Sequence, residues 1–314
     1  MKAGTYRRPR PLPAGGTIGL FAPSGVIDVE RHEKSVVHLR SVGFKVVVAE
    51  EATAHYRYFA GTDEQRLASF HQMLADPSLD AMMMIRGGYG WSRILHRIDW
   101  NLVASAQKTL VGFSDFTALN LAALAKCGLI SFAGPGAAID FGGADDPGAV
   151  QADHAFMDAH CWPALRGDPV YAGPFNCEHA RGEQRIEGPL WGSNLSLLAH
   201  LVGTPYLPAI EGGILFLEEI GEQPYAVERM FLQLLHAGIL QKQKAIILAD
   251  FSDCDPEDGR FPYSMVHVAE TLRDLLPIPV LTRLPFGHVP RKLTLPFGAI
   301  GTLDIRAGEY SLAY

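Results

Sequence analysis

The chain has 314 residues, which is enough to bury a sizeable core and to form two domains. Its hydrophobic content of 48% and charged content of 19% are ordinary for a soluble globular enzyme, and a net charge of −7 argues against a nucleic-acid partner. No apolar run approaches the roughly 18 residues that span a bilayer, and the basic N-terminal tail has no apolar segment behind it. We therefore expect no membrane partner and a cytoplasmic location.

Strand and helix patterns alternate over residues 14–140, the expected first domain. Strand-like apolar runs lie at 16–22, 44–49, 81–85, 109–112 and 129–132, and helical patterns at 29–40, 62–75, 91–98 and 115–127. Thr62 and Gln65 have the spacing of a capping box at the start of the second helix. This alternation predicts an α/β fold with a doubly wound, mainly parallel sheet, in which ligands bind beyond the carboxyl ends of the strands.

Glycine and proline punctuate residues 141–182, which we interpret as a connection with one short helix at 151–160. Residues 183–314 then form a second periodic region. Helical patterns lie at 194–202, 224–236 and 265–275, strand patterns at 213–218 and 245–248, and short alternating runs at 292–314. We expect a smaller C-terminal α/β domain with short antiparallel strands.

Ser114 lies at a predicted strand-to-helix turn, after the apolar residues Leu110 and Val111. Such a turn exposes a hydroxyl at the sheet edge and directs the first N–H groups of the helix toward whatever it attacks. This geometry suits a nucleophile whose reaction generates an oxyanion. A serine before Asp115 and Thr117 is also a good helix cap, so the turn alone leaves both interpretations open.

Two further residues could complete a catalytic set. Glu218 ends an apolar strand at the edge of a core, where a carboxylate needs a partner, and His288 lies in a loop between glycine and proline. The order serine, acid, histidine is that of α/β-hydrolases. Their G-x-S-x-G motif is absent, however, because Phe116 occupies the second glycine position.

Five motifs together resemble the LD-carboxypeptidases, the muramoyl-tetrapeptide carboxypeptidase family of serine peptidases. They are RGGYGWSRIL, GFSDFTALN, GPLWGSNLSLLAHLVGTP, GILFLEEIGEQPYAVERMFLQLLHAGIL and PFGHVPRKLTLPFG, in that order. The resemblance implies that Ser114 is the nucleophile, Glu218 the acid and His288 the base. It also implies that backbone N–H groups of Gly88 and Asp115 form the oxyanion hole.

The family's reaction removes the terminal D-alanine from murein tetrapeptides, at the bond between the L-diamino acid and D-alanine, during cell-wall recycling. The resemblance thus implies murein-derived peptides as substrate, a cytoplasmic homodimer and no cofactor. Where the family pattern often has Gly-Gly-Asn, this chain has Gly192, Ser193 and Asn194, a mild departure that leaves the triad unchanged, and we expect Asn194 to bind substrate. A carboxypeptidase also needs a cation for the free carboxylate, and Arg86 and Arg229 are candidates.

The cysteines provide no alternative chemistry, because their spacing fits neither a disulfide framework nor a zinc site, and we expect no metal. They are Cys127, Cys161, Cys177 and Cys254. Three alternatives remain. One is an immunity peptidase of the same superfamily acting on a peptide-nucleotide antibiotic, and the second is a non-catalytic module that binds nucleotides through its glycine-rich turns. The third, a catalytically inactive homologue, is disfavoured by the intact Ser, Glu and His set.

Overall fold

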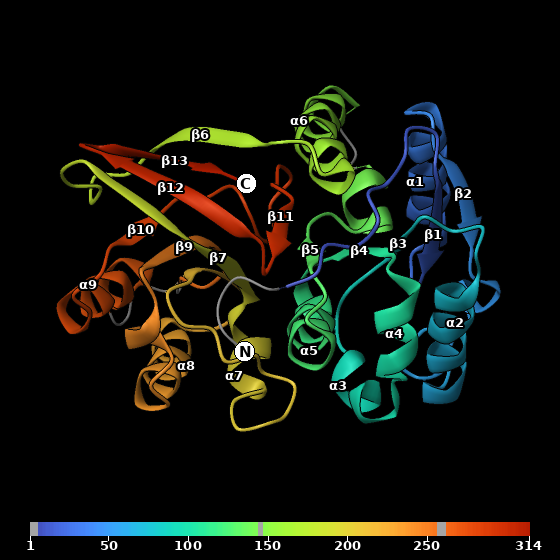
Figure 1. The fold of residues 1–314 in the computed structure, drawn as a ribbon, viewed down its shortest axis with the longest axis horizontal. Coiled ribbons are helices and arrows are strands. Elements are labelled where there is room, and N and C mark those ends of the chain that lie inside the picture. The colour runs from blue at the N-terminus through green and yellow to red at the C-terminus, as the bar shows by residue number, and fades with distance from the viewer. Residues whose placement is uncertain (1–5, 144–146, 256–261) are drawn as a thin grey trace.

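The computed structural model describes residues 6–143, 147–255 and 262–314, and the chain forms two α/β units, each built on its own sheet (Figure 1). The predicted α/β fold class is confirmed. Within the described ranges, none of the helices combines the length and apolar character that a membrane crossing requires.

The first sheet has six strands in the order β11-β5-β4-β3-β1-β2. Their bounds are β1 Thr17–Phe21, β2 Lys45–Val48, β3 Ala81–Met84, β4 Thr109–Gly112, β5 Ser131–Ala133 and β11 Leu295–Phe297. Strands β1 to β5 run parallel, and β11 is antiparallel to β5. Strands β3 and β4 are buried along their whole length, which explains why their sequences are uninterrupted apolar runs rather than alternating patterns.

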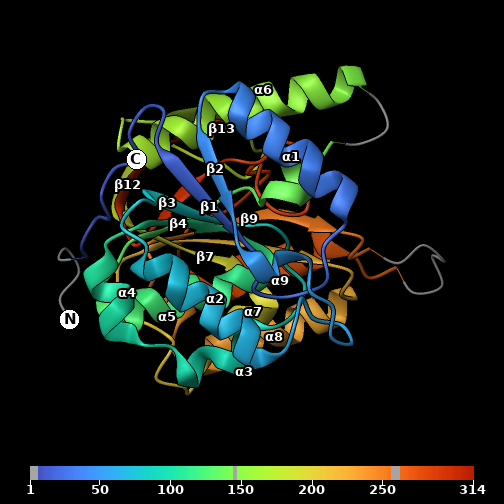
Figure 2. The same ribbon diagram turned by 90° about the vertical axis from the view of Figure 1, so that its right-hand side faces the viewer.

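Helices cover both faces of this sheet (Figure 2). One side carries α1 (Val29–Ser41) and α6 (Pro147–Arg166); the other carries α2 (Asp63–Ala75), α3 (Trp91–Ile94), α4 (Trp100–Ala106) and α5 (Thr117–Cys127). The predicted capping box begins α2, because the Thr62 hydroxyl accepts from the Gln65 N–H and the Gln65 side chain accepts from the Thr62 N–H. The doubly wound arrangement expected from the alternating pattern is confirmed.

The second sheet has seven strands in the order β10-β9-β8-β7-β12-β13-β6. Their bounds are β6 Tyr171–Asn176, β7 Gln184–Asn194, β8 Ile214–Ile220, β9 Ala245–Ser252, β10 Val280–Thr282, β12 Ile300–Arg306 and β13 Glu309–Ala313. Strands β7 to β10 are parallel, whereas β12, β13 and β6 are antiparallel. Helices α7 (Leu195–His200), α8 (Pro224–His236) and α9 (Met265–Leu275) lie along the parallel half (Figure 1).

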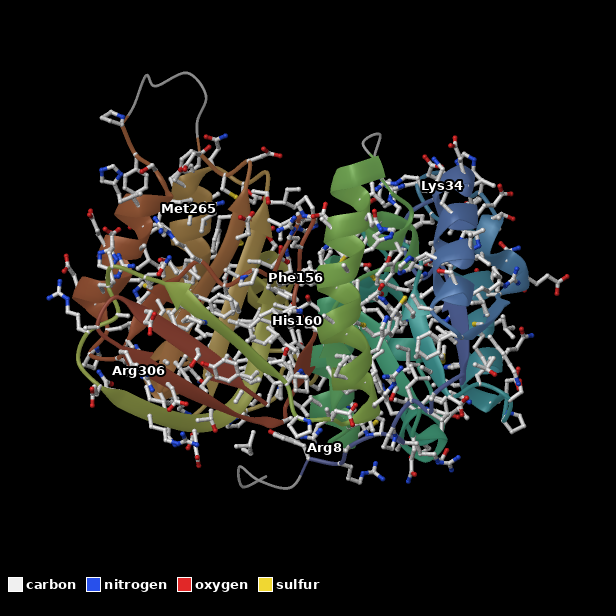
Figure 3. All side chains as sticks on the ribbon, turned by 90° about the horizontal axis from the view of Figure 1, so that it is seen from above. Arg8, Lys34, Phe156, His160, Met265 and Arg306 are labelled. Atoms are coloured by element: carbon white, nitrogen blue, oxygen red, sulfur yellow. The ribbon has the colours of Figure 1, made fainter. Side chains whose placement is uncertain are left out.

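The expected connection at 141–182 is more structured than its sequence suggests. Helix α6 is 20 residues long and continues through Pro163, whereas we expected a short helix. Its buried residues Met157, Cys161 and Leu165 recur every four positions, but the proline obscured this pattern because proline usually ends a helix. Seen from above, α6 lies between α1 and the strands of the second sheet (Figure 3). Strand β6, also in this segment, joins the second sheet beside β13.

Contacts of several kinds join the two units, whose buried apolar residues form one continuous core. Strand β11 belongs to the C-terminal part of the chain, yet it pairs with β5 of the first sheet. The ring of Phe297 on β11 packs against that of Phe216 on β8, with centroids 6.4 Å apart. The Thr117 hydroxyl on α5 bonds to the Ser193 hydroxyl at 3.0 Å and accepts from the Asn194 N–H at 3.2 Å. The carboxyl end of β7 is therefore held against the turn that follows β4.

Candidate active site

Ser114 occupies a strained turn between β4 and α5. Its φ of +59° lies in the left-handed region, which costs a non-glycine residue about 1–3 kcal/mol and is common at functional sites. Every residue from 108 to 124 is buried except Ser114, which is partly exposed. The Asp115 N–H follows in the first turn of the helical segment, where N–H groups have no intrahelical partner. The turn therefore presents one hydroxyl beside a backbone N–H at the start of a helical segment.

The glycine-rich turn after β3 lies directly against this serine. A Cβ placed on Gly87 would come within 3.2 Å of Ser114 Oγ, so a side chain there would crowd the hydroxyl. Gly88 is exposed and has φ +109°, and a Cβ on it would overlap the Tyr58 hydroxyl. Backbone rather than side chain therefore lines this face of Ser114, as an oxyanion hole requires.

His288 and Glu218 come from different elements of the second unit and form a hydrogen-bonded pair. His288 Nδ1 lies 2.9 Å from Glu218 Oε2, and Glu218 is completely buried on β8. The other oxygen of Glu218 is buried without a hydrogen-bond partner among the described residues. Since the carboxylate accepts from Nδ1–H, the free imidazole nitrogen is Nε2, the one able to take a proton.

The His288 loop packs closely against the sheet and reaches the Ser114 turn. Gly287 has φ +130°, and a Cβ there would meet Glu218 Cβ at 3.2 Å and Asp250 Cβ at 3.2 Å, so a larger residue would push His288 away. The His288 ring packs against Phe113, with centroids 5.1 Å apart. Because Phe113 directly precedes Ser114, this contact brings the imidazole to the Ser114 turn.

A buried ion pair supports Phe113 from another direction. Lys292 and Asp140 are almost completely buried, with Lys292 Nζ 2.6 Å from Asp140 Oδ1. The Lys292 ammonium also lies 3.6 Å from the centroid of the Phe113 ring, a cation–π contact. Sequence reasoning missed this pair, because its members are 152 residues apart.

The Asp115 side chain links three turns at the carboxyl ends of β1, β3 and β4. Its Oδ2 accepts from the Ser24 hydroxyl at 2.5 Å and from the Trp91 N–H at 3.0 Å. Burial raises the pKa of this carboxyl to about 6, against the lowering effect of those two hydrogen bonds. We predicted a role only for the Asp115 backbone; an aspartate directly after the serine was the one signal for this second role.

The three residues expected to bind substrate have different environments. Arg86 is exposed and its guanidinium donates to the Val26 carbonyl. Asn194 is buried next to Glu218 in register, but its amide donates to Glu219 at 3.0 Å and its oxygen caps α7. Burial raises the pKa of Glu219. Arg229 is exposed on α8.

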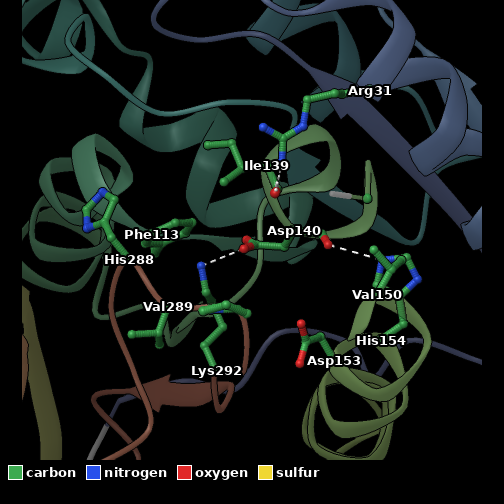
Figure 4. Close-up of a pocket in the computed structure, with 12 residues that line it drawn as sticks. Arg31, Phe113, Ile139, Asp140, Val150, Asp153, His154, His288, Val289 and Lys292 are labelled. Carbon is green, nitrogen blue, oxygen red and sulfur yellow. Dashed lines mark hydrogen bonds and ion pairs between the residues drawn. The ribbon is translucent and has the colours of Figure 1, made fainter. Parts of the chain in front are cut away.

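A cavity of about 300 Å³ opens beside His288 (Figure 4). Its walls come from the first turn of α1, the turn at 137–143, α6 and the His288 loop, and include Arg31, Asp140, His154 and Val289. Sequence reasoning singled out none of these four residues. The four cysteines are free thiols, and no group of three His, Cys, Asp or Glu residues within the described ranges could hold a metal ion.

Comparison with known proteins identifies the family of this chain. Residues 18–134 match the LD-carboxypeptidase N-terminal domain and residues 187–303 the LD-carboxypeptidase C-terminal domain. The murein tetrapeptide carboxypeptidase of Pseudomonas aeruginosa is 32% identical over 93% of this chain and 94% of its own.

Solved structures agree with this assignment. The muramoyltetrapeptide carboxypeptidase from Oxalobacter formigenes is 36% identical, with a TM-score of 0.82 over 95% of this chain and 98% of that chain. The microcin C7 self-immunity protein MccF, solved in complex with glutamyl sulfamoyl guanosine, is 27% identical, with a TM-score of 0.85 over 98% of both chains. The chain described here therefore belongs to the LD-carboxypeptidase family.

Proposed function

We propose that this protein is a serine LD-carboxypeptidase that removes the terminal D-alanine from murein tetrapeptides, using Ser114, Glu218 and His288 as its triad. The observation that carries the proposal is the 2.9 Å pair of His288 and Glu218, with the His288 ring packed on Phe113 next to Ser114. A buried acid, an oriented imidazole and a serine on a strained turn are the parts that acyl transfer needs.

In the proposed reaction, His288 Nε2 takes the proton of Ser114 as Oγ attacks the carbonyl carbon of the diamino acid. The N–H groups of Asp115 and Gly88 donate to the resulting oxyanion. The intermediate then collapses, the C–N bond breaks, and protonated His288 gives its proton to the leaving amine of D-alanine. Water, deprotonated by His288, hydrolyses the ester and regenerates Ser114. Glu218 orients the imidazole and stabilises the imidazolium.

The names of the relatives support a murein peptide as substrate. We further propose a cytoplasmic homodimer that acts in cell-wall recycling. Catalysis is divided between a nucleophile domain at 14–140 and a domain at 183–314 that carries the acid and the base. Sedimentation analysis tests the dimer.

Mass spectrometry of a purified tetrapeptide after incubation with the protein tests the reaction. The expected product is a tripeptide lighter by one alanine, released with free D-alanine. A peptide that ends in L-alanine is the matched control and should be cut much more slowly, because the wrong configuration misplaces the scissile carbonyl. No cleavage of the D-terminal peptide by folded protein would contradict the proposal.

A second candidate function is supported by the likeness to MccF, whose complex with glutamyl sulfamoyl guanosine has the same fold across the whole chain. The same triad could cleave an aminoacyl-nucleotide conjugate of that kind. Measuring kcat/KM for a tetrapeptide and for an aminoacyl sulfamoyl nucleoside on one preparation separates the two functions. The tetrapeptide should give the larger value.

A further inference from the structure

Among the charged groups that line the cavity beside His288, one cation has no carboxylate partner within the described residues. Two carboxylates of the wall have a cationic partner: Asp140 pairs with Lys292 at 2.6 Å, and Asp153 pairs with Arg291 at 2.8 Å. His154 lies 3.2 Å from the Asp140 carbonyl, and burial lowers the pKa of its imidazole, so the ring is neutral at pH 7. Together these groups contribute no net charge to the cavity.

Arg31 is the cationic residue of this wall that forms no ion pair with the described residues. Its Nη2 donates to the Ile139 carbonyl at 2.8 Å, but no carboxylate of the described residues lies within ion-pair distance of it. Its Nε is buried without an acceptor among those residues. A half-buried guanidinium left with an unsatisfied donor and no counter-ion is destabilising unless something else uses its charge. Figure 4 shows Arg31 at one side of the cavity and Asp153 at the opposite side.

The position of the cavity indicates what could fill it. In the proposed reaction His288 must reach the leaving amine, so a cavity that His288 lines receives groups only a few bonds from the scissile bond. A planar guanidinium with free N–H donors is suited to a carboxylate, which it can bind through two parallel hydrogen bonds.

We infer that this cavity is a substrate subsite in which Arg31 binds a carboxylate of the peptide. The inference rests on the proposed function, because it assumes a murein peptide in the site. Such a peptide has two carboxylates near the scissile bond. One is the free C-terminus of D-alanine, and the other is on the side chain of the diamino acid when that residue is meso-diaminopimelate rather than lysine. Both would use the same guanidinium.

Steady-state kinetics of Arg31→Gln and the unchanged protein on three substrates test this inference. They are the meso-diaminopimelate tetrapeptide, its lysine counterpart, and the meso-diaminopimelate tetrapeptide with a C-terminal amide. Loss of the charge-assisted hydrogen bonding by Arg31 should raise KM for the first substrate roughly 10- to 100-fold with little change in kcat. Arg31→Lys should reverse part of the increase in KM, since lysine keeps the positive charge but cannot form two parallel hydrogen bonds to a carboxylate. Arg40→Gln, an exposed arginine on the same helix, is the matched control and should change neither constant.

The three substrates distinguish the two carboxylates. If Arg31 binds the C-terminus, Arg31→Gln should remove the preference of the unchanged protein for the free acid over the amide. If it binds the side chain, the preference for meso-diaminopimelate over lysine should disappear instead. Titration of the tetrapeptide into Ser114→Ala and Ser114→Ala/Arg31→Gln measures the same difference in Kd without turnover.

Two results would overturn the inference. The first leaves the proposed function intact, and the second contradicts the proposed function as well. If the unchanged protein cleaves tetrapeptides and Arg31→Gln has the same KM on all three substrates, the subsite assignment is wrong while the proposed function stands. A KM increase in Arg86→Gln or Arg229→Gln instead would then identify the true carboxylate ligand. If the unchanged protein neither binds nor cleaves any tetrapeptide, the proposed function and this inference both fail.

Discussion

The turn that carries Ser114 and the pair of Glu218 and His288 are built in different ways. The Ser114 turn is encoded within one short stretch, where β4, a strained residue and α5 follow one another directly. The pair of Glu218 and His288 joins residues 70 positions apart, through one hydrogen bond between β8 and a loop. Backbone geometry holds the Ser114 turn in place, whereas packing within the second α/β unit holds the pair of Glu218 and His288.

This contrast predicts different kinds of sensitivity. If the proposed triad is correct, substitutions in the Ser114 turn should lower the rate of the chemical step directly, because backbone geometry fixes the position of the hydroxyl. Changes at the pair should act through orientation of the imidazole. The Thr117 bonds to Ser193 and Asn194 connect the two regions, so they decide how well one is positioned against the other.

Removing the nucleophile should have the largest effect. Ser114→Ala is expected to lower kcat by about 10⁴- to 10⁶-fold, because no other group can form the acyl-enzyme. The rate of D-alanine release from a tetrapeptide measures this loss of kcat, and circular dichroism checks that the variant is folded. Ser105→Ala, an exposed serine on α4, is the control and should keep full activity. Turnover near that of the unchanged protein would remove Ser114 from the triad.

Changing the acid should have the next largest effect. Glu218→Gln retains the shape but not the charge that orients His288 and stabilises its protonated form, so kcat should fall about 10³- to 10⁴-fold. The neighbouring buried carboxylate provides a matched comparison. Glu219→Gln should lower kcat less than about tenfold, because Glu219 bonds to Asn194 and the Ser196 N–H rather than to the base. Equal losses of kcat in Glu218→Gln and Glu219→Gln would show that activity depends on buried negative charge in general and not on the pair of Glu218 and His288.

Asp115 should make the nucleophile region sensitive to pH. Burial raises the pKa of this carboxyl in the folded protein to about 6, above its ordinary value of 3.8. The folded state therefore binds more protons than the unfolded state between these values, and stability falls as pH rises from about 4 to about 6, by about 3 kcal/mol. Asp115→Asn has no carboxyl group at this position, so its stability lacks this dependence on pH.

Urea unfolding at pH 4.5, 5.5 and 7 checks this expectation. The free energy of unfolding of Asp115→Asn should increase relative to the unchanged protein as pH rises, and the difference should level off above pH 6. A difference that is constant over this range would mean that Asp115 titrates alike in both states.

The smallest expected effect concerns the link between the two regions. Thr117→Val keeps the shape but loses the bonds to the Ser193 hydroxyl and the Asn194 N–H, so stability should fall by about 1–3 kcal/mol. Turnover should fall by about tenfold, since small displacements of a general base lower rate. Thr117→Ser keeps the hydroxyl and should restore both. If Thr117→Val lost stability but kept full turnover, the link would hold the fold without positioning the site.

Much of the first unit could be predicted from sequence. The apolar runs of β3 and β4 and the capping box of α2 are local signals, and each is confirmed. Helix α6 was underestimated because Pro163 interrupts a pattern that burial of Met157, Cys161 and Leu165 nevertheless sustains. The pairing of β11 with β5 could not be predicted, since short alternating strands do not indicate which sheet they join.

The sequence by itself determined the strand-turn-helix around Ser114, because backbone geometry and apolar periodicity are local properties. It also named Glu218 and His288 as candidates, but the expected strand end at Glu218 was wrong, since β8 continues to Ile220. Only the tertiary structure decided which side chains meet. The Asp115 bonds to Ser24 and Trp91, the Lys292 pair under Phe113 and the Arg31 bond to the Ile139 carbonyl all depend on segments far apart in the chain. Such contacts form when two sheets pack around one core, and no local spacing specifies them.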